Sequence, residues 1–213
     1  LSGTMASNEI AGAKSKGVYS FMKHFALNDQ ETNRNSMLCT WSNEQAMREI
    51  CLKPFEMSVK EGGAQAAMSS FNYIGTTYAG ANSALLNNVL RDEWGFRGFV
   101  ETDYFGNFDV YQDADQEIRN GNDAMLSTMS TTNHVESKSA TSVKAMRQAA
   151  HNILYTTANC WMYKDGQAKE ETPIWKTATY VAIAVIAVLV VVLETTTIRR
   201  FMVRRKSTIT ISR

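Results

Sequence analysis

At residues 95–104 the chain reads Gly-Phe-Arg-Gly-Phe-Val-Glu-Thr-Asp-Tyr. Leucines and a valine at helical spacing precede this stretch at residues 85–90, and its two glycines interrupt the chain before the apolar pair Phe99 and Val100. This order predicts a helix that leads into a buried strand ending at Asp103. Because barrel enzymes carry their chemistry at the C-terminal ends of parallel strands, Asp103 is a candidate catalytic carboxylate. A solvated loop residue or a helix cap is the ordinary alternative for a carboxylate at such a position.

A second pair of polar groups follows another predicted strand. Residues 18–22 read Val-Tyr-Ser-Phe-Met and run directly into Lys23 and His24. Residues 66–72 predict a further strand. Strands that alternate with helices and end in polar groups are typical of βα units with a parallel sheet. Taken without that pattern, Lys23 and His24 would more simply be a solvated pair.

Three motifs together resemble a known family. The chain reads Lys-His-Phe-Ala at residues 23–26, Asn-Asp-Gln-Glu at 28–31 followed by Arg34, and Met-Ser-Ser-Phe-Asn at 68–72. With residues 95–104, these motifs resemble glycoside hydrolase family 3, the β-glucosidase-like family. The resemblance implies an α/β fold in which residues 1–162 form the C-terminal half of a (β/α)8 TIM barrel. It also implies retaining hydrolysis of O-glycosidic bonds in a glycoside or oligosaccharide substrate, with no cofactor and no metal.

The resemblance assigns roles to three polar residues. Asp103 takes the position of the nucleophile, and Lys23 and His24 match the pair that hydrogen-bonds the hydroxyls of the sugar being cleaved. Retaining glycosidases use one carboxylate to attack the anomeric carbon and a second carboxyl group to protonate the leaving oxygen. Asp103 must therefore be ionised, and we expect the Lys23 cation to lie close enough to keep it so.

Three apolar or aromatic residues complete the implied substrate-binding set. Tyr104 takes the place of an aromatic residue that packs against the bound sugar. Phe71 stands where the family often has Tyr, so a hydroxyl that helps to orient the nucleophile is missing. Met68 belongs to the same strand end and lines either the pocket or, more simply, the core.

The family-like region is too short for a whole barrel. A complete (β/α)8 barrel takes about 250 residues, whereas about four βα units are predicted here. We therefore expect a longer protein that supplies the N-terminal half of the barrel and a separate acid/base domain, and no acid/base residue can be named in this chain. Two alternatives remain open: a degenerate or truncated barrel that binds carbohydrate without hydrolysis, and a membrane-bound scaffold with neither activity.

The C-terminal part of the chain predicts a membrane anchor. Residues 177–193 carry no charge, and five basic residues follow between 199 and 206. We expect a linker at 163–176, a transmembrane helix at 177–198 and a basic cytoplasmic tail at 199–213. Basic residues favour the cytoplasmic side, so the predicted location is the cell membrane, in a single pass with the catalytic portion outside. A buried strand or core helix is the alternative.

Charge and cysteine content exclude other classes. The 22 Lys and Arg residues nearly balance the 21 Asp and Glu residues, so no nucleic-acid partner is indicated. The three cysteines, Cys39, Cys51 and Cys160, form no CxxC pair, so neither a zinc site nor a disulfide framework is expected. We expect them to be free, buried thiols.

Helices are predicted at residues 43–61, with a kink at Pro54, and at 139–159. The second helix carries a predicted inward apolar face of Val143, Met146, Ala150, Ile153, Leu154 and Thr157. A short helix at 113–119 and a last strand at 124–126 flank Asp123, which is expected to be structural.

Overall fold

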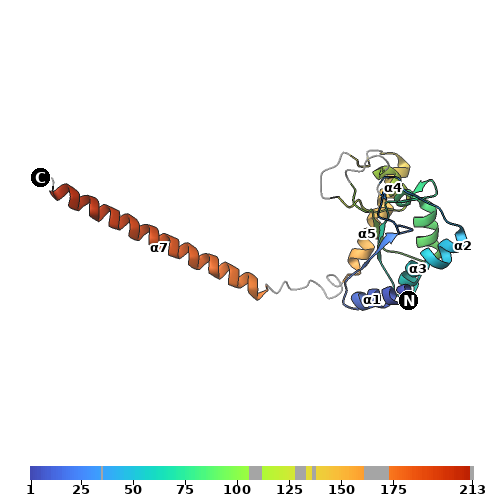
Figure 1. The fold of residues 1–213 in the computed structure, drawn as a ribbon, viewed down its shortest axis with the longest axis horizontal. Helices are drawn as coiled ribbons and strands as arrows, with labels where there is room; N and C mark the ends of the chain where they lie inside the picture. Colours follow the sequence, from blue (N-terminus) through green and yellow to red (C-terminus); the bar gives the residue numbers. More distant parts are fainter. Residues whose placement is uncertain (35, 106–111, 128–132, 136–137, 161–172, 212–213) are drawn as a thin grey trace. The chain divides into compact units, whose positions relative to one another are not determined.

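The structure is a computed structural model that describes residues 1–34, 36–105, 112–127, 133–135, 138–160 and 173–211, with side chains through residue 202 (Figure 1). Two compact units divide the chain, Leu1–Ala168 and Lys169–Arg213. Each is described by itself. The predicted linker at 163–176 falls partly outside the described residues.

A parallel sheet forms the centre of the first unit. Its strands are β1 (Phe21–Phe25), β3 (Ala66–Ser69) and β6 (Phe99–Glu101), in the order β1-β3-β6. Beyond β6, Ala124 forms a parallel bridge with Glu101, and its carbonyl accepts the Thr102 N–H at 3.0 Å. The predicted strand at 124–126 is thus a short bridging segment. Strand β1 starts at Phe21, later than predicted, so that Lys23 and His24 lie within the strand.

The two faces of this sheet have different environments. Met22, Ala67 and Val100 occupy neighbouring positions in the three strands and belong to the buried core. On this side the core continues into the helices through residues such as Leu86 and Leu90. Side chains alternate along a strand, so the residues before and after these three face the opposite side. In a closed barrel that opposite side is the interior, and we call it the inner face.

Between β1 and β3 the chain forms three short helical segments rather than one kinked helix. They are α2 (Glu44–Ala46), the π-helical η1 (Met47–Cys51) and α3 (Lys53–Lys60). Pro54 lies in the first turn of α3, where its missing N–H costs no intrahelical hydrogen bond. The prediction of a kink at Pro54 was therefore wrong, because proline begins a new helix here. Helix α1 (Ser2–Ser15) packs on α3.

The other helices in the described part of this unit are η2 (Ala79–Ala81), the π-helical η3 (Ala84–Glu93), α4 (Ala114–Asn120) and α5 (Ala140–Ala158). Gly98, between η3 and β6, lies so close to β3 that a Cβ atom there would overlap the backbone of Gln65. Only glycine fits at that position without a shift of the chain.

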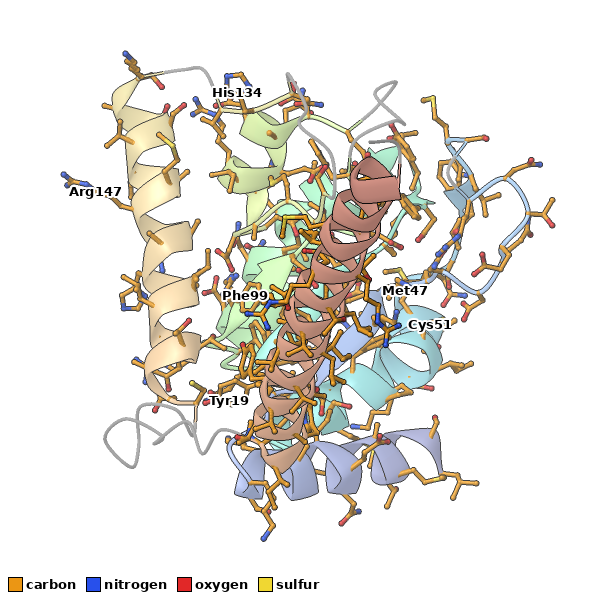
Figure 2. The ribbon with its side chains drawn as sticks, turned by 90° about the vertical axis from the view of Figure 1, so that its left-hand side faces the viewer. Tyr19, Met47, Cys51, Phe99, His134 and Arg147 are labelled. Carbon is orange, nitrogen blue, oxygen red and sulfur yellow. The ribbon has the colours of Figure 1, made fainter. Side chains whose placement is uncertain are left out.

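Helix α5 buries a different face from the one predicted. Its buried residues are Ser142, Ala149, Asn152 and Thr156, whereas Leu154 is 66% exposed. Arg147 extends away from the unit (Figure 2). The prediction was wrong because the polar residues have partners inside: the Ser142 hydroxyl donates to Asp115, and the Thr156 hydroxyl donates to the Gln65 carbonyl.

A second sheet that the sequence did not predict extends from the strand ends. It consists of β2 (Cys39–Thr40), β4 (Tyr73–Ile74) and β5 (Thr77–Tyr78), in the order β2-β4-β5. The three cysteines are free, as predicted, but Cys39 in this sheet is exposed, which corrects the expectation of buried thiols.

The second unit contains helix α7 (Ile174–Ile211). Within the described residues, Ile174–Met202 is the one segment that is helical, long and apolar enough to cross a membrane. None of its most apolar window is buried against protein.

Candidate active site

Asp103 lies just beyond the end of β6 and is only 7% exposed. Its Oδ2 atom is 3.4 Å from His24 Nε2 and 3.5 Å from Arg34 Nη1. Its Oδ1 atom accepts a hydrogen bond from the Tyr104 backbone N–H at 2.8 Å. A carboxylate this deeply buried has lost most of its contact with water, and these donors and cations replace that contact.

His24 reaches Asp103 from the neighbouring end of β1. Burial lowers the pKa of His24, and the Asp103 carboxylate opposes that effect by raising it. The lowered pKa favours a neutral imidazole at neutral pH, which can donate one hydrogen bond from Nε2. The peptide bond between Lys23 and His24 is cis.

Arg34 is a site residue that the sequence analysis missed as a contact of Asp103. Its Nε atom is 2.9 Å from Glu31, and its guanidinium lies 5.0 Å from the centre of the Phe71 ring. It comes from the loop after β1, 69 residues before Asp103 in sequence. Its place in the Asn-Asp-Gln-Glu…Arg motif was the signal that could have identified it. Periodicity, however, does not predict which way the side chain of a loop residue points.

Lys23 does not take the position expected for it. The described side-chain contacts of Asp103 come from His24 and Arg34, whereas the Lys23 side chain is exposed. Burial lowers the pKa of His24, and the Lys23 charge adds to that effect; burial raises the pKa of Glu101, and the Lys23 charge opposes that rise. The expectation that the Lys23 cation lies next to Asp103 was therefore wrong, because Arg34 is the cation that contacts this carboxyl group.

Of the other three predicted residues, Phe71 and Tyr104 adjoin this group. Phe71 is buried under the Arg34 guanidinium, and Met68 is buried in β3. Tyr104 is half-buried, and its carbonyl accepts a hydrogen bond from Gln112 at 3.3 Å. His24 therefore contacts Asp103 directly, and Phe71 is connected to it through Arg34.

Buried polar side chains fix these strand ends. The Asn72 amide donates to the Ala26 carbonyl at 3.2 Å and to the Thr40 hydroxyl at 3.4 Å, and the Ser70 hydroxyl also donates to Ala26. These bonds tie β1, β3 and the second sheet together beside the site. They hold the backbone that carries His24 and Phe71 in place.

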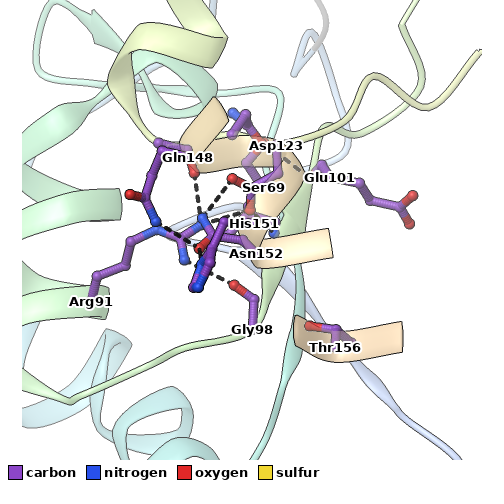
Figure 3. A network of polar contacts seen from close by, with 12 residues as sticks. Ser69, Arg91, Gly98, Glu101, Asp123, Gln148, His151, Asn152 and Thr156 are labelled. Atoms are coloured by element: carbon purple, nitrogen blue, oxygen red, sulfur yellow. Dashed lines mark hydrogen bonds and ion pairs between the residues drawn. The ribbon is translucent and has the colours of Figure 1, made fainter. Parts of the chain in front are cut away.

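A second polar network lies on the helix side of the sheet (Figure 3). Asp123 Oδ2 accepts from Arg91 at 2.7 Å and from the Val100 N–H at 2.8 Å, and Oδ1 accepts from Asn152 at 2.8 Å. Burial raises the pKa of Asp123, while the Arg91 charge and these donors act in the opposite direction. Since Asp123 joins η3, β6 and α5, its contacts are those of a structural residue.

The site offers one buried carboxylate beside a cation and an imidazole, at the C-terminal end of a parallel sheet. Within the described part of the chain, no group of three His, Cys, Asp or Glu residues could hold a metal ion. The groups present suit attack by Asp103 on an electrophilic carbon and hydrogen bonding to a polyhydroxylated ligand.

This arrangement places polar groups at the C-terminal ends of parallel strands, where (β/α) barrel proteins carry their sites, and comparison with known proteins identifies the family. Residues 1–156 match the glycosyl hydrolase family 3 N-terminal domain, so the chain belongs to that family. Beta-glucosidase B of Emericella nidulans is 42% identical over 106 residues, covering 50% of this chain and 12% of that protein. A beta-glucosidase of Rhizobium radiobacter is 44% identical over 106 residues, which cover 50% of this chain and 13% of that protein.

Solved structures give the same result. Beta-glucosidase 3B from Thermotoga neapolitana, in complex with alpha-D-glucose, matches with a TM-score of 0.67 and 30% identity, covering 83% of this chain and 26% of that one. A beta-glucosidase from Paenibacillus barengoltzii matches with a TM-score of 0.65 and 29% identity, and the match covers 81% of this chain and 20% of that one. The chain thus spans between about a tenth and a quarter of the length of these relatives.

Proposed function

We propose that this chain is part of a glycoside hydrolase that cleaves β-linked glucosides by a retaining mechanism, with Asp103 as nucleophile. The observation that carries the proposal is the convergence of Arg34 and His24 on a buried carboxylate at the end of β6. The named relatives that match this chain are beta-glucosidases, which supports the substrate class.

In the first step, an Asp103 oxygen attacks the anomeric carbon, and the bond from that carbon to the leaving oxygen breaks. The leaving oxygen takes a proton from an acid/base group, which we assign to a segment other than this chain. In the second step, water gives a proton back to that group and attacks the same carbon, so that Asp103 leaves as a carboxylate. Arg34 and His24 hold Asp103 in the position for attack, and Lys23, His24, Tyr104, Phe71 and Met68 form the wall toward the sugar.

The test is covalent trapping in the intact natural protein. A 2-deoxy-2-fluoro glucoside should leave a glucosyl adduct on the peptide that contains Asp103, detected by mass spectrometry, and the Asp103→Asn variant should show none. Asp113→Asn, at the exposed start of α4, is the matched control and should label normally. An adduct on another residue, or normal labelling of Asp103→Asn, would refute the assignment.

A second candidate is carbohydrate binding without hydrolysis. Phe71 favours it, because the hydroxyl that the family often places there is absent. This candidate predicts that glucose raises the melting temperature of the protein and that no product or adduct forms. Glucose binding lost in Arg34→Met, together with absent turnover, would favour it over the hydrolase.

We also propose that α7 anchors the protein in a cell membrane, with the family domain outside and the basic C-terminus in the cytoplasm. Its length, its apolar composition and the five basic residues that follow between 199 and 206 support this proposal.

A further inference from the structure

Glu117 is a buried carboxyl group that the candidate active site does not use. It is one of the residues that α4 buries, and its exposed fraction is 0%. Within the described part of the chain, neither of its two carboxyl oxygens has a hydrogen-bond partner. An ionised carboxylate without a partner is so costly inside a protein that the group binds a proton instead.

The charges on α4 itself do not compensate a carboxylate at this position. Burial raises the pKa of Glu117 well above its usual range, and the nearby Asp113 carboxylate adds to that rise. The Asp113 backbone N–H acts in the opposite direction, but this effect is the weakest of the three, and the N–H does not reach hydrogen-bonding geometry. The cation of this helix, Arg119, is bound elsewhere, to Asp115 and to the Ser142 hydroxyl.

The elements packed on α4 bring no buried cation to it either. Helix α4 packs mainly against η2 and α5. The sequence of η2 contains no titratable side chain. The titratable residues of α5 are exposed or, for the tyrosine, half-buried: Lys144, Arg147, His151 and Tyr155. Burial without compensation is therefore the environment of Glu117 on every packed side that the structure describes.

Helix α4 is tied at both ends to the neighbours of Asp103. Before the helix, the Gln112 side chain donates to the Tyr104 carbonyl at 3.3 Å. After the helix, the Ala124 carbonyl accepts the Thr102 N–H at 3.0 Å. Since Thr102 and Tyr104 precede and follow Asp103 in sequence, a displacement of α4 acts on the backbone at both sides of that carboxylate.

We infer that Glu117 carries a proton in the folded protein, and that its ionisation in alkaline solution displaces α4 and with it the backbone around Asp103. A carboxylate formed inside the fold regains water only when α4 moves. Because the pKa of Glu117 is raised in the folded state, the helix is held at lower pH and is released as the pH rises through that raised value. The consequence for catalysis rests on the proposed function, whereas the consequence for α4 does not.

The proton is detected by infrared spectroscopy of the full chain in detergent micelles. At about pH 6, where an ordinary glutamate is ionised, the difference between wild type and Glu117→Gln should contain the carbonyl stretching band of a protonated carboxyl group. Glu61→Gln, at the exposed end of α3, is the control and should change carboxylate bands alone. A Glu117→Gln difference with carboxylate bands alone overturns the inference.

The displacement of α4 is measured by hydrogen exchange and mass spectrometry of the peptide that contains this helix. Between about pH 6 and about pH 9, after correction for the chemical exchange rate, exchange in wild type should rise roughly tenfold. Glu117→Gln and Glu117→Met are uncharged at every pH and should show no such rise. Two variants are used because an amide at this position can itself disturb the packing. An equal rise in wild type and in both variants overturns the inference.

The effect on the site is measured in the intact natural protein as the rate of trapping by a 2-deoxy-2-fluoro glucoside. The rate should fall in wild type at alkaline pH, and Glu117→Gln should retain its rate to higher pH. An identical alkaline loss in both would overturn the link between α4 and Asp103. If wild type is labelled at no pH, the proposed function fails, and the infrared and exchange measurements still decide the state of Glu117.

Discussion

At the scale of single residues, the balance of charge around Asp103 decides what the site can do. A buried carboxylate is costly unless cations or donors compensate it, and here Arg34, His24 and the Tyr104 N–H do so. Arg34 also packs on Phe71, which restricts its guanidinium to one side of Asp103. Two predictions follow from these contacts.

Replacing Arg34 should reduce the rate at which Asp103 reacts. Arg34→Met keeps much of the side-chain volume but removes the charge, and the trapping rate with a 2-fluoro glucoside should fall roughly 100-fold. Arg97→Met, an exposed arginine that contacts Tyr155, is the control and should retain the wild-type rate. Equal rates in the two variants would remove Arg34 from the mechanism.

The pKa of His24 should respond to Asp103 in a defined direction. Burial lowers this pKa and the Asp103 charge raises it, so Asp103→Asn should lower the pKa of His24 further. NMR titration of the imidazole carbon-bound protons measures the change, with the His151 resonance as an internal control. A pKa that rises or stays constant in Asp103→Asn would mean that the two groups do not interact.

At the scale of elements, buried polar contacts replace the apolar packing that the sequence suggested. Asp123 links η3, β6 and α5 through Arg91, the Val100 N–H and Asn152. The inner side of α5 therefore consists of small and polar residues, and Val143, Met146 and Leu154 remain exposed. The position of β6, and with it of Asp103, depends on this network.

Removing Asp123 should destabilise the family domain strongly. Asp123→Ala leaves the Arg91 guanidinium buried without its carboxylate, which costs about 3–5 kcal/mol in comparable sites. Urea unfolding followed by circular dichroism measures the loss. Asp92→Ala, on the exposed side of η3, is the matched control and should change stability by less than about 0.5 kcal/mol. Similar stabilities for the two variants would contradict the structural role.

At the scale of the whole molecule, the chain combines a part of a barrel with an apolar helix. The segment Ile174–Met202 has a helical length of about 43 Å, which exceeds the hydrocarbon core of a bilayer. The described parallel sheet comprises β1, β3, β6 and the bridging segment at Ala124.

The membrane proposal predicts how the chain fractionates in cells. The full chain should stay in the membrane pellet after carbonate washing, because its apolar helix requires a bilayer. Val188→Arg places a charge near the centre of the span, where it costs about 2.5–3.5 kcal/mol, and should shift a clear fraction to the supernatant. Ser2→Arg, in the exposed first turn of α1, should not. Complete release of the unmodified chain would refute the anchor.

The sequence alone determined the strand-end position of Asp103, His24 beside it, the family and the apolar helix, because these depend on local order and short motifs. Only the tertiary structure decided that Arg34 rather than Lys23 contacts Asp103, and which face of α5 is buried. The reason is physical. Loop direction, register between strands and the partners of buried polar groups depend on segments that lie far apart in the chain, and no local pattern records them.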